Sequence, residues 1–307
     1  MAVNRTEQLH DEARGLDHQP PHQIAALLAK AQGEAAAVVT HVSADIACAA
    51  DLAASALEQG GRLVYAAAGS SGLMALADAL ELPGTFGIAR DRIVVLLAGG
   101  IESLTHLTGA PEDDAEHGVR DVTAANLNSN DCLIAISASG STPYAVGALH
   151  AAKSRGLKTI AMANNPGAPI LELANIGILL ATPPEIIAGS TRMGAGTAQK
   201  IALNLLSTLA AIRLGHVHDG YMVNLHADNA KLKARATHIV ASITNCSEER
   251  ARACLEQAGG SVKPAVLLAA GAVDLTAALR LLDSNGQKLR PALVELEGSF
   301  GSHLRSA

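Results

Sequence analysis

The chain has 307 residues, 49% of them hydrophobic and 17% charged, so it is long enough to bury a core and is not dominated by disorder. Its 23 Lys and Arg against 29 Asp and Glu give a net charge of −6 without a basic cluster, which argues against nucleic acid or an anionic membrane as a partner. Aromatic residues make up only 2%, so a sugar ligand would be held by hydrogen bonds and charge.

Cysteine spacing and the N-terminal sequence bear on where the protein works. The four cysteines are widely spaced and form no C-x-x-C pair, which is typical of reduced thiols. The N-terminus is polar and lacks the apolar core of a signal peptide. The Ala-rich stretch from Ile24 is broken by Lys30 and Glu34, short of the ~20 apolar residues of a membrane span. We therefore expect a cytoplasmic protein with no membrane contact.

The first two thirds of the chain alternate between helical and extended patterns. Pro20-Pro21 leads into an Ala-rich helical region, 24–59, interrupted near Gly33. Five short apolar runs rich in β-branched residues follow, at 62–68, 92–98, 131–137, 158–163 and 176–181. Helical segments such as 73–80 and 143–155 lie between most of them. Continuous apolar strands alternating with helices predict an α/β fold with a doubly wound, five-stranded parallel sheet.

The last third is helical by the same criteria. A helix over 191–214 is expected to end at Gly215, and 229–243 follows the same period. The tail from 247 to about 293 contains short amphipathic stretches separated by glycines, which predicts about three small helices. We expect three parts: an N-terminal helical segment (1–60) packed on a sheet domain (61–240), and a small helical subdomain (241–307).

Two predicted turns combine glycine with hydroxyl side chains. Gly69-Ser70-Ser71-Gly72 follows the first strand, and the 137–142 turn (SASGST) follows the third and precedes Pro143. Glycine allows close backbone approach, hydroxyls donate hydrogen bonds, and a helix N-terminus supplies free amides, a combination that suits a phosphate monoester. Ordinary turns with serine N-caps are the alternative. Neither turn matches the dinucleotide or P-loop pattern.

These turns and four other segments resemble the SIS (sugar isomerase) domain family and, more narrowly, the N-acetylmuramic acid 6-phosphate etherases. The resemblance extends from the N-terminus to about residue 235, in the family's order, and the helical tail resembles the family's C-terminal subdomain. The matching segments are 6–8 (TEQ), 69–72 (GSSG), 78–87 (DALELPGTFG), 111–114 (PEDD), 138–144 (ASGSTPY) and 189–200 (GSTRMGAGTAQK).

The resemblance implies a flavodoxin-like αβα sandwich, a homodimer, a sugar-phosphate ligand and no metal or organic cofactor. It implies cleavage of the D-lactyl ether of N-acetylmuramic acid 6-phosphate to N-acetylglucosamine 6-phosphate and D-lactate, a step in cell-wall amino-sugar breakdown and recycling. The family's acid/base roles fall on Glu81 and Glu112. Candidate phosphate or carboxylate contacts fall on Ser70, Ser71, Gly72, Ser139, Gly140, Ser141, Thr142, Ser190 and Arg192.

The implied reaction explains the need for two carboxyl groups. In the open-chain sugar a base removes the C2 proton, an acid protonates the departing C3 oxygen, and water then adds to C3. Glu112, near a predicted helix start, is expected to be the ionised base. Glu81, in an apolar stretch before Pro83, is expected to be the protonated acid. Without the resemblance, each also fits a solvated acid at the end of a helix.

The chain departs from the family pattern at three cationic positions. Leu73, Ser141 and Gly194 stand where the family usually has Arg, Arg and Lys. The loss of three cations around an anionic substrate leaves two alternatives open. One is a different sugar-phosphate isomerase or lyase on the same fold, and the other is a sugar-phosphate-sensing regulator without turnover.

Overall fold

The computed structural model describes residues 4–105, 109–225 and 229–303 of the chain. The chain divides into two units. The sheet unit comprises Met1–Leu80 and Arg90–Ala210, and the helical unit comprises Glu81–Ala89 and Ala211–Ala307.

The sheet unit is built on five parallel strands, as the sequence predicts. They are β1 (Leu63–Ala67), β2 (Ile93–Leu97), β3 (Cys132–Ile136), β4 (Lys158–Ala163) and β5 (Ile176–Leu179), in the order β2-β1-β3-β4-β5. In register, Ala67 of β1 lies beside Leu97 of β2 and Ile136 of β3, so their carboxyl ends share one edge of the sheet. β1 and β3 are buried along their whole length, which explains their unbroken apolar sequences.

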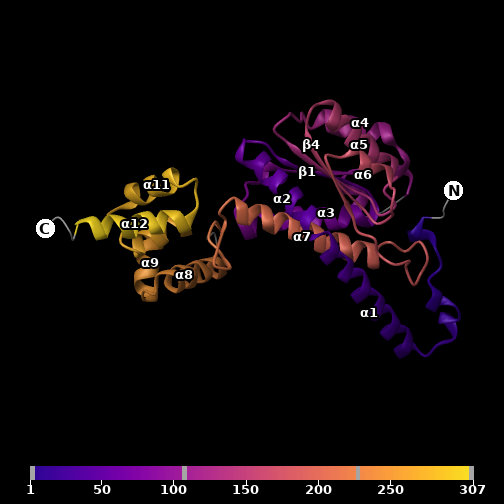
Figure 1. The fold of residues 1–307 in the computed structure, drawn as a ribbon, viewed down its shortest axis with the longest axis horizontal. Helices are drawn as coiled ribbons and strands as arrows, with labels where there is room; N and C mark the ends of the chain where they lie inside the picture. Colours follow the sequence, from indigo (N-terminus) through magenta and orange to yellow (C-terminus); the bar gives the residue numbers. More distant parts are fainter. Residues whose placement is uncertain (1–3, 106–108, 226–228, 304–307) are drawn as a thin grey trace. The chain divides into compact units, whose positions relative to one another are not determined.

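Helices cover both faces of this sheet (Figure 1). One face carries α4 (Ala115–Ala124), α5 (Pro143–Ser154) and α6 (Pro169–Leu173), whose buried apolar side chains form one core with β1, β3 and β4. The other face carries α2 (Ser43–Glu58), α3 (Gly69–Phe86) and α7 (Gly194–Arg213). The αβα sandwich of the predicted fold class is confirmed.

A buried carboxylate joins three elements on the second face. Asp78 of α3 is 3% exposed and accepts hydrogen bonds from the hydroxyl of Tyr65 on β1 (2.8 Å). It also accepts from Asn204 (2.7 Å) and Ser207 (2.9 Å) of α7. These three donors compensate the desolvation of the carboxyl group and fix the position of α3, the helix that begins at the first candidate loop.

The N-terminal helical region differs from the prediction in where it breaks. α1 (Pro21–Ala37) passes through Gly33 without interruption, and the break is the 3-10 turn Val38–Val42, where β-branched residues cluster. By length and composition alone the stretch 21–58 is sufficient to cross a bilayer. Its second half, α2, instead buries Ile46, Ala49 and Ala53 within the sheet unit, and this packing accounts for its apolar composition.

The helical unit contains a two-stranded hairpin and five helices among its described residues. The hairpin joins β6 (Val217–His218) to β7 (Tyr221–Met222), and the helices are α8 (Ala230–Thr244), α9 (Glu248–Gln257), α10 (Val262–Ala269), α11 (Leu275–Ser284) and α12 (Leu289–His303). Four helices follow residue 247 rather than the predicted three. The prediction missed α12 because the predicted helical tail ended near residue 293, the fifth residue of α12. The hairpin was also missed, because two-residue strands carry no period.

Candidate active site

The strand order places one edge of the sheet at a topological switch point. After β1 the chain crosses to β2 on one side, and after β3 it crosses to β4 on the other, so the two connections diverge between neighbouring strands. Parallel α/β sheets bind their ligands at such a point, beyond the carboxyl ends of the strands. The two glycine- and hydroxyl-rich turns predicted from the sequence both lie here.

A cavity of about 340 Å³ opens at this edge, and we call it the sheet cleft. Its walls combine the turns after β1 and β3 with segments from three other parts of the sheet unit. The lining residues are Thr6, Glu7, Ala68, Gly69, Ser70, Ser71, Glu112, Ser137, Ala138, Ser139, Thr142, Gly189 and Thr191. The wall is therefore made of hydroxyl groups and glycine backbone, with two carboxyl groups and no Lys or Arg among the described lining residues.

The turn after β3 is organised around the hydroxyl of Ser137. This oxygen accepts from the Gly140 backbone N–H (2.9 Å) and shares a hydrogen bond with the hydroxyl of Thr142 (2.8 Å). Gly140 has φ +72°, and a Cβ there would lie 2.3 Å from that of Ala168, so only glycine fits. The resulting tight turn leads into α5 at Pro143 and leaves the Ser139 and Thr142 hydroxyls on the cleft wall.

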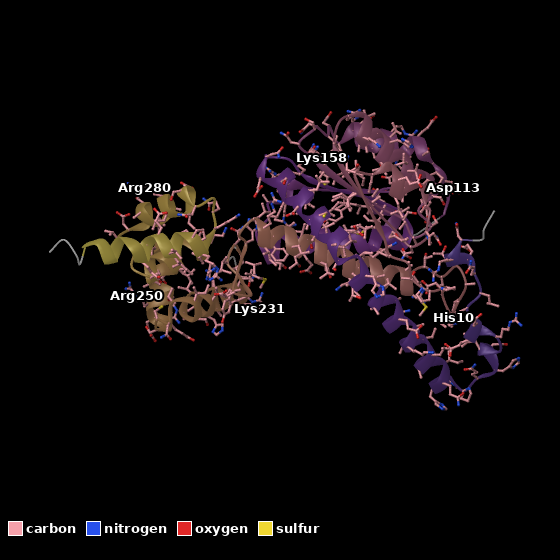
Figure 2. All side chains as sticks on the ribbon, viewed as in Figure 1. His10, Asp113, Lys158, Lys231, Arg250 and Arg280 are labelled. Carbon is pink, nitrogen blue, oxygen red and sulfur yellow. The ribbon has the colours of Figure 1, made fainter. Side chains whose placement is uncertain are left out.

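The turn after β1 brings the backbone against Glu112. Gly69 begins α3 with φ +52°, and a Cβ at this position would lie 2.7 Å from Oε1 of Glu112. Glu112 belongs to a 3-10 turn, Ala110–Asp113, that precedes α4. Its half-buried carboxyl faces the cleft, whereas its neighbour Asp113 is exposed (Figure 2).

The electrostatics of Glu112 differ from the prediction. Burial, followed by the adjacent charge of Asp113, raises the pKa of Glu112 above its ordinary value. The expected helix start would have lowered it. The structural reason is that Asp114, not Glu112, is the N-cap of α4, where its carboxylate accepts from His117 N (2.8 Å). A carboxylate with a raised pKa is a stronger proton acceptor once ionised, which suits a general base.

The N-terminal segment closes one side of the cleft. Thr6 is buried; its N–H donates to the side-chain oxygen of Asn165 (3.3 Å), and its carbonyl accepts from Gly189 N (2.9 Å). Asn165 also donates to the Ala138 carbonyl of the β3 turn (3.3 Å). These bonds hold Glu7 in the cleft wall, where its Oε2 would be 3.2 Å from a Cβ at Gly189.

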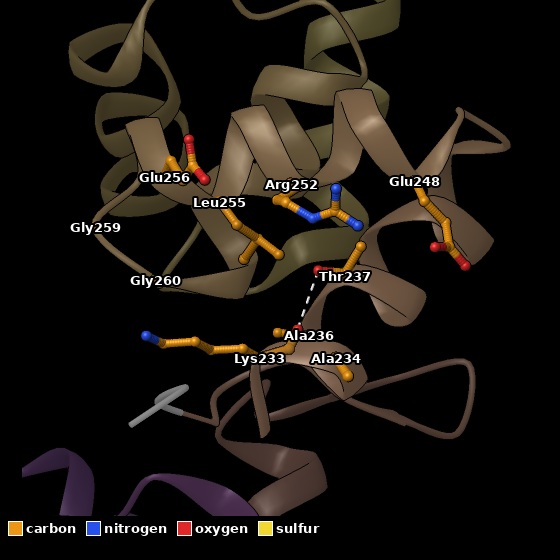
Figure 3. Close-up of a pocket in the computed structure, with 10 residues that line it drawn as sticks. All are labelled: Lys233, Ala234, Ala236, Thr237, Glu248, Arg252, Leu255, Glu256, Gly259 and Gly260. Atoms are coloured by element: carbon orange, nitrogen blue, oxygen red, sulfur yellow. Dashed lines mark hydrogen bonds between the residues drawn. The ribbon is translucent and has the colours of Figure 1, made fainter. Parts of the chain in front are cut away.

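A second cavity, of about 770 Å³, lies in the helical unit between α8 and α9 (Figure 3). Its wall mixes Lys233 and Arg252 with Glu248 and Glu256, all of them exposed, and lacks a glycine- and hydroxyl-rich strand-to-helix turn. Among the described residues, no group of three His, Cys, Asp or Glu side chains is placed to hold a metal ion. The sheet cleft is therefore the candidate active site.

Comparison with known proteins identifies the family. Residues 28–164 match the SIS domain model. The N-acetylmuramic acid 6-phosphate etherase of Deinococcus radiodurans is 42% identical over 95% of this chain and 96% of its own length, and that of Streptomyces avermitilis is 40% identical over 94% and 93%. The chain belongs to the N-acetylmuramic acid 6-phosphate etherase family. A solved phosphoheptose isomerase from Francisella tularensis covers 63% of this chain and 97% of its own, with 20% identity and a TM-score of 0.46.

The etherase-family residues named from the sequence fall into two groups. Ser70, Ser71, Glu112, Ser139 and Thr142 line the cleft. Gly72, Gly140, Ser141, Ser190 and Arg192 are not in its wall, although the two glycines and Ser141 belong to the same turns and Ser190 and Arg192 flank the lining residue Thr191.

Glu81, the expected acid of the family, is also outside the wall of the cleft. It belongs to the helical unit and is exposed, not enclosed by the apolar stretch around it. Pro83 does not end the helix, because α3 continues through it to Phe86. Glu81 is therefore on a helix with solvent beside it.

Three contributors to the cleft were missed or given little weight in the sequence prediction. Ser137 organises the β3 turn, Asn165 links that turn to the N-terminal segment, and Glu7 places a second carboxyl in the wall. The Thr6-Glu7-Gln8 match to the family was the available signal for Glu7. Nothing in the local pattern around Asn165 indicates its contacts, because its partners are 159 and 27 residues away.

Proposed function

We propose that this protein cleaves the D-lactyl ether of N-acetylmuramic acid 6-phosphate, giving N-acetylglucosamine 6-phosphate and D-lactate, in the breakdown and recycling of cell-wall amino sugars. The observation that carries this proposal is a half-buried carboxyl, Glu112, inside a hydroxyl-lined cleft at the switch point of an etherase-family sheet. The reaction is proposed for the cytoplasm, which agrees with the free, buried thiols of Cys132 and Cys254.

Phosphate binding is assigned to the turns after β1 and β3. Ser70, Ser71, Ser139 and Thr142 line the cleft, and α3 and α5 begin there. The first N–H groups of a helix have no partner within the helix itself and so can bind a phosphate. Hydroxyl donors and two helix N-termini stabilise a phosphate monoester without a lysine. This arrangement makes the absence of cations at positions 73, 141 and 194 compatible with a sugar-phosphate ligand.

The ether bond is broken by elimination. Glu112 removes the C2 proton of the open-chain aldehyde, the C3–O bond breaks, and a carboxylic acid protonates the leaving lactate oxygen. Water then adds to C3 of the unsaturated aldehyde, and the C2 proton is returned. We assign the acid role to Glu81, following the family, and the base role to Glu112, following its place in the cleft.

A homodimer is part of the proposal. α7 carries Leu205 and Leu209, one helical turn apart and exposed by 41% and 37%, and Leu80 of α3 is 61% exposed. Large apolar side chains at i and i+4 on a helix form a stripe that a second helix covers in an oligomer. In the dimer, Glu81 of the partner subunit is proposed to complete the active site.

An isotope experiment tests the reaction. Incubating the protein with N-acetylmuramic acid 6-phosphate in deuterated water is expected to release D-lactate and to place deuterium at C2 of the sugar product. Deuterium at C2 without lactate would indicate isomerase chemistry. Tight binding with neither product would indicate a sensor and would contradict the proposal.

The Glu112→Gln variant tests the base. It keeps the shape of the side chain but cannot accept the proton, so we expect kcat to fall about 10²–10⁴-fold with an unchanged circular dichroism spectrum. The matched control is Glu116→Gln, which makes the same change at an exposed glutamate outside the cleft. Turnover by Glu112→Gln within a few fold of the control would remove Glu112 from the mechanism.

A further inference from the structure

A cavity of about 340 Å³ in the helical unit contains a buried charge that the proposed reaction does not use. Its wall is formed by the start of α10, by α11 and by the segment that follows β7. Most of the wall is apolar, including Val223, Leu225 and Leu282, and the polar lining residues are Asn224, Ser261, Lys263 and Gln287.

Lys263 is the only charged residue among those that line this cavity, and its side chain is 4% exposed. The ammonium donates to one acceptor, the Gln287 carbonyl (2.8 Å). An ammonium carries three donors, and among the described residues no carboxylate acts on the charge of Lys263. Burial without a counter-charge lowers the pKa of Lys263 to about 8, so the group is still mostly charged at neutral pH.

The position of Lys263 in its helix adds to the unbalanced charge. α10 begins at Val262, so Lys263 lies in the first turn, where the helix already presents free N–H groups and a positive partial charge. The N-cap residue is Ser261, whose hydroxyl does not cap the helix. A lysine is unfavourable at this end of a helix and an anion is favourable. The buried ammonium and the helix N-terminus would therefore both be stabilised by a negative charge in the cavity.

The neighbouring groups do not neutralise the ammonium. Burial, followed by the charge of Lys263, lowers the pKa of His216 to about 4, although a hydrogen bond with the Phe86 backbone acts in the opposite direction. The imidazole is therefore neutral at neutral pH. Its buried Nδ1 has no hydrogen-bond partner in the described chain. The nearby carboxylate of Asp283 is exposed and accepts from the Gln287 side-chain amide (2.8 Å).

We propose that this cavity is a binding site for a small oxyanion, a phosphate or carboxylate group, held by the Lys263 ammonium and the Ser261 hydroxyl at the N-terminus of α10. A buried ammonium with unused donors gains most from a ligand that supplies negative charge and several acceptor oxygens. The cavity volume is in the range of small-ligand sites. The inference does not rest on the proposed ether cleavage.

Phosphate binding to the full chain tests the site. The affinity for inorganic phosphate is measured by isothermal titration calorimetry for three proteins: wild type, Lys263→Met and the matched control Lys288→Met. The control removes an exposed lysine outside the cavity. Because the sheet cleft is also expected to bind phosphate, each variant is repeated in a Ser139→Ala background. Lys263→Met removes one charged hydrogen-bonding partner, so we expect it to weaken phosphate affinity at one site about ten- to a hundredfold. Lys288→Met is expected to bind as wild type does. Equal binding by Lys263→Met and Lys288→Met would overturn the proposal.

A measurement on the wild-type protein covers the case in which Lys263→Met does not fold. Crystals are soaked in selenate, a tetrahedral oxyanion with an anomalous scatterer, and a peak within hydrogen-bond distance of Lys263 Nζ is expected. Anomalous peaks elsewhere and none at Lys263 would also overturn the proposal.

Competition then distinguishes the source of the anion. If N-acetylglucosamine 6-phosphate displaces inorganic phosphate from the Lys263 site, the oxyanion is a group of the sugar phosphate. If both bind at once, the ligand of this site is free phosphate. Either result supports an oxyanion site at Lys263. If neither inorganic phosphate nor the sugar phosphate binds there, the proposal is contradicted.

Discussion

Glu7 shows how much of a site depends on contacts between distant residues. From the sequence, a Thr-Glu pair near the N-terminus is equally consistent with a loose tail. In the structure, Thr6 is fixed by Asn165 and Gly189, and Glu7 lines the same cleft as the predicted serine turns. The turns themselves were predictable because glycine, hydroxyl and proline act locally. The environments of Glu112 and Glu81 were not, because burial and the continuation of α3 through Pro83 are set by packing.

The position of Glu7 predicts a role in sugar binding. A carboxylate in the cleft wall accepts hydrogen bonds from sugar hydroxyls, and an amide accepts them less strongly, so we expect Glu7→Gln to raise KM about tenfold with kcat within about twofold of wild type. Asp11→Asn, an exposed acid in the same segment but outside the cleft, is the control and should change neither constant. A fall in kcat at constant KM would instead assign Glu7 to proton transfer.

At the scale of elements, the strands and most helices follow from pattern alone. β1 and β3 are recognisable because both faces are covered. α8 matches the helical segment predicted over 229–243, and the structure adds that Asn229 caps it by accepting from Leu232 N (2.9 Å). What the sequence did not indicate is how the elements are joined. Asp131, one residue before β3, is fully buried and accepts from the Arg62 backbone N–H (2.8 Å) and guanidinium (2.8 Å), which precede β1.

This Arg62–Asp131 pair predicts acid sensitivity of the sheet unit. Burial alone would raise the pKa of Asp131, but hydrogen bonds from Arg62 and from the backbone of Asn128 and Arg62, with the Arg62 charge, bring it below 3.8. A lowered folded-state pKa stabilises the protein above the unfolded value and loses that contribution as pH falls through the folded value.

We therefore expect the free energy of unfolding to decrease as the pH falls below about 4, and Asp131 to account for part of this loss. Urea unfolding at a series of pH values measures this drop. Asp131→Asn should be less stable at neutral pH, and its stability should depend less steeply on pH below about pH 4. An unchanged slope in that variant would show that other carboxylates cause the acid loss.

At the scale of the whole molecule, one chain places Glu112 in the sheet cleft and Glu81 outside its wall, yet the proposed elimination needs both at one substrate. Sequence reasoning named both acids from the family motifs but had no interface pattern from which to place them together. The exposed leucines of α7 supply such a pattern in the structure. In a dimer that covers these leucines, Glu81 of the partner subunit can serve as the acid. Such a dimer predicts that two different inactive variants restore activity when mixed, which a site within one chain does not.

Mixed dimers of Glu81→Gln and Glu112→Gln decide between these arrangements. Each variant alone is expected to be inactive. If each active site takes one acid from each subunit, random mixing gives half heterodimers with one intact site each, so about a quarter of the wild-type activity returns. If one chain supplies both acids, mixing restores nothing. Leu209→Asp should abolish both the dimer, measured by analytical ultracentrifugation, and the recovered activity, because a buried unpaired charge disrupts an apolar interface.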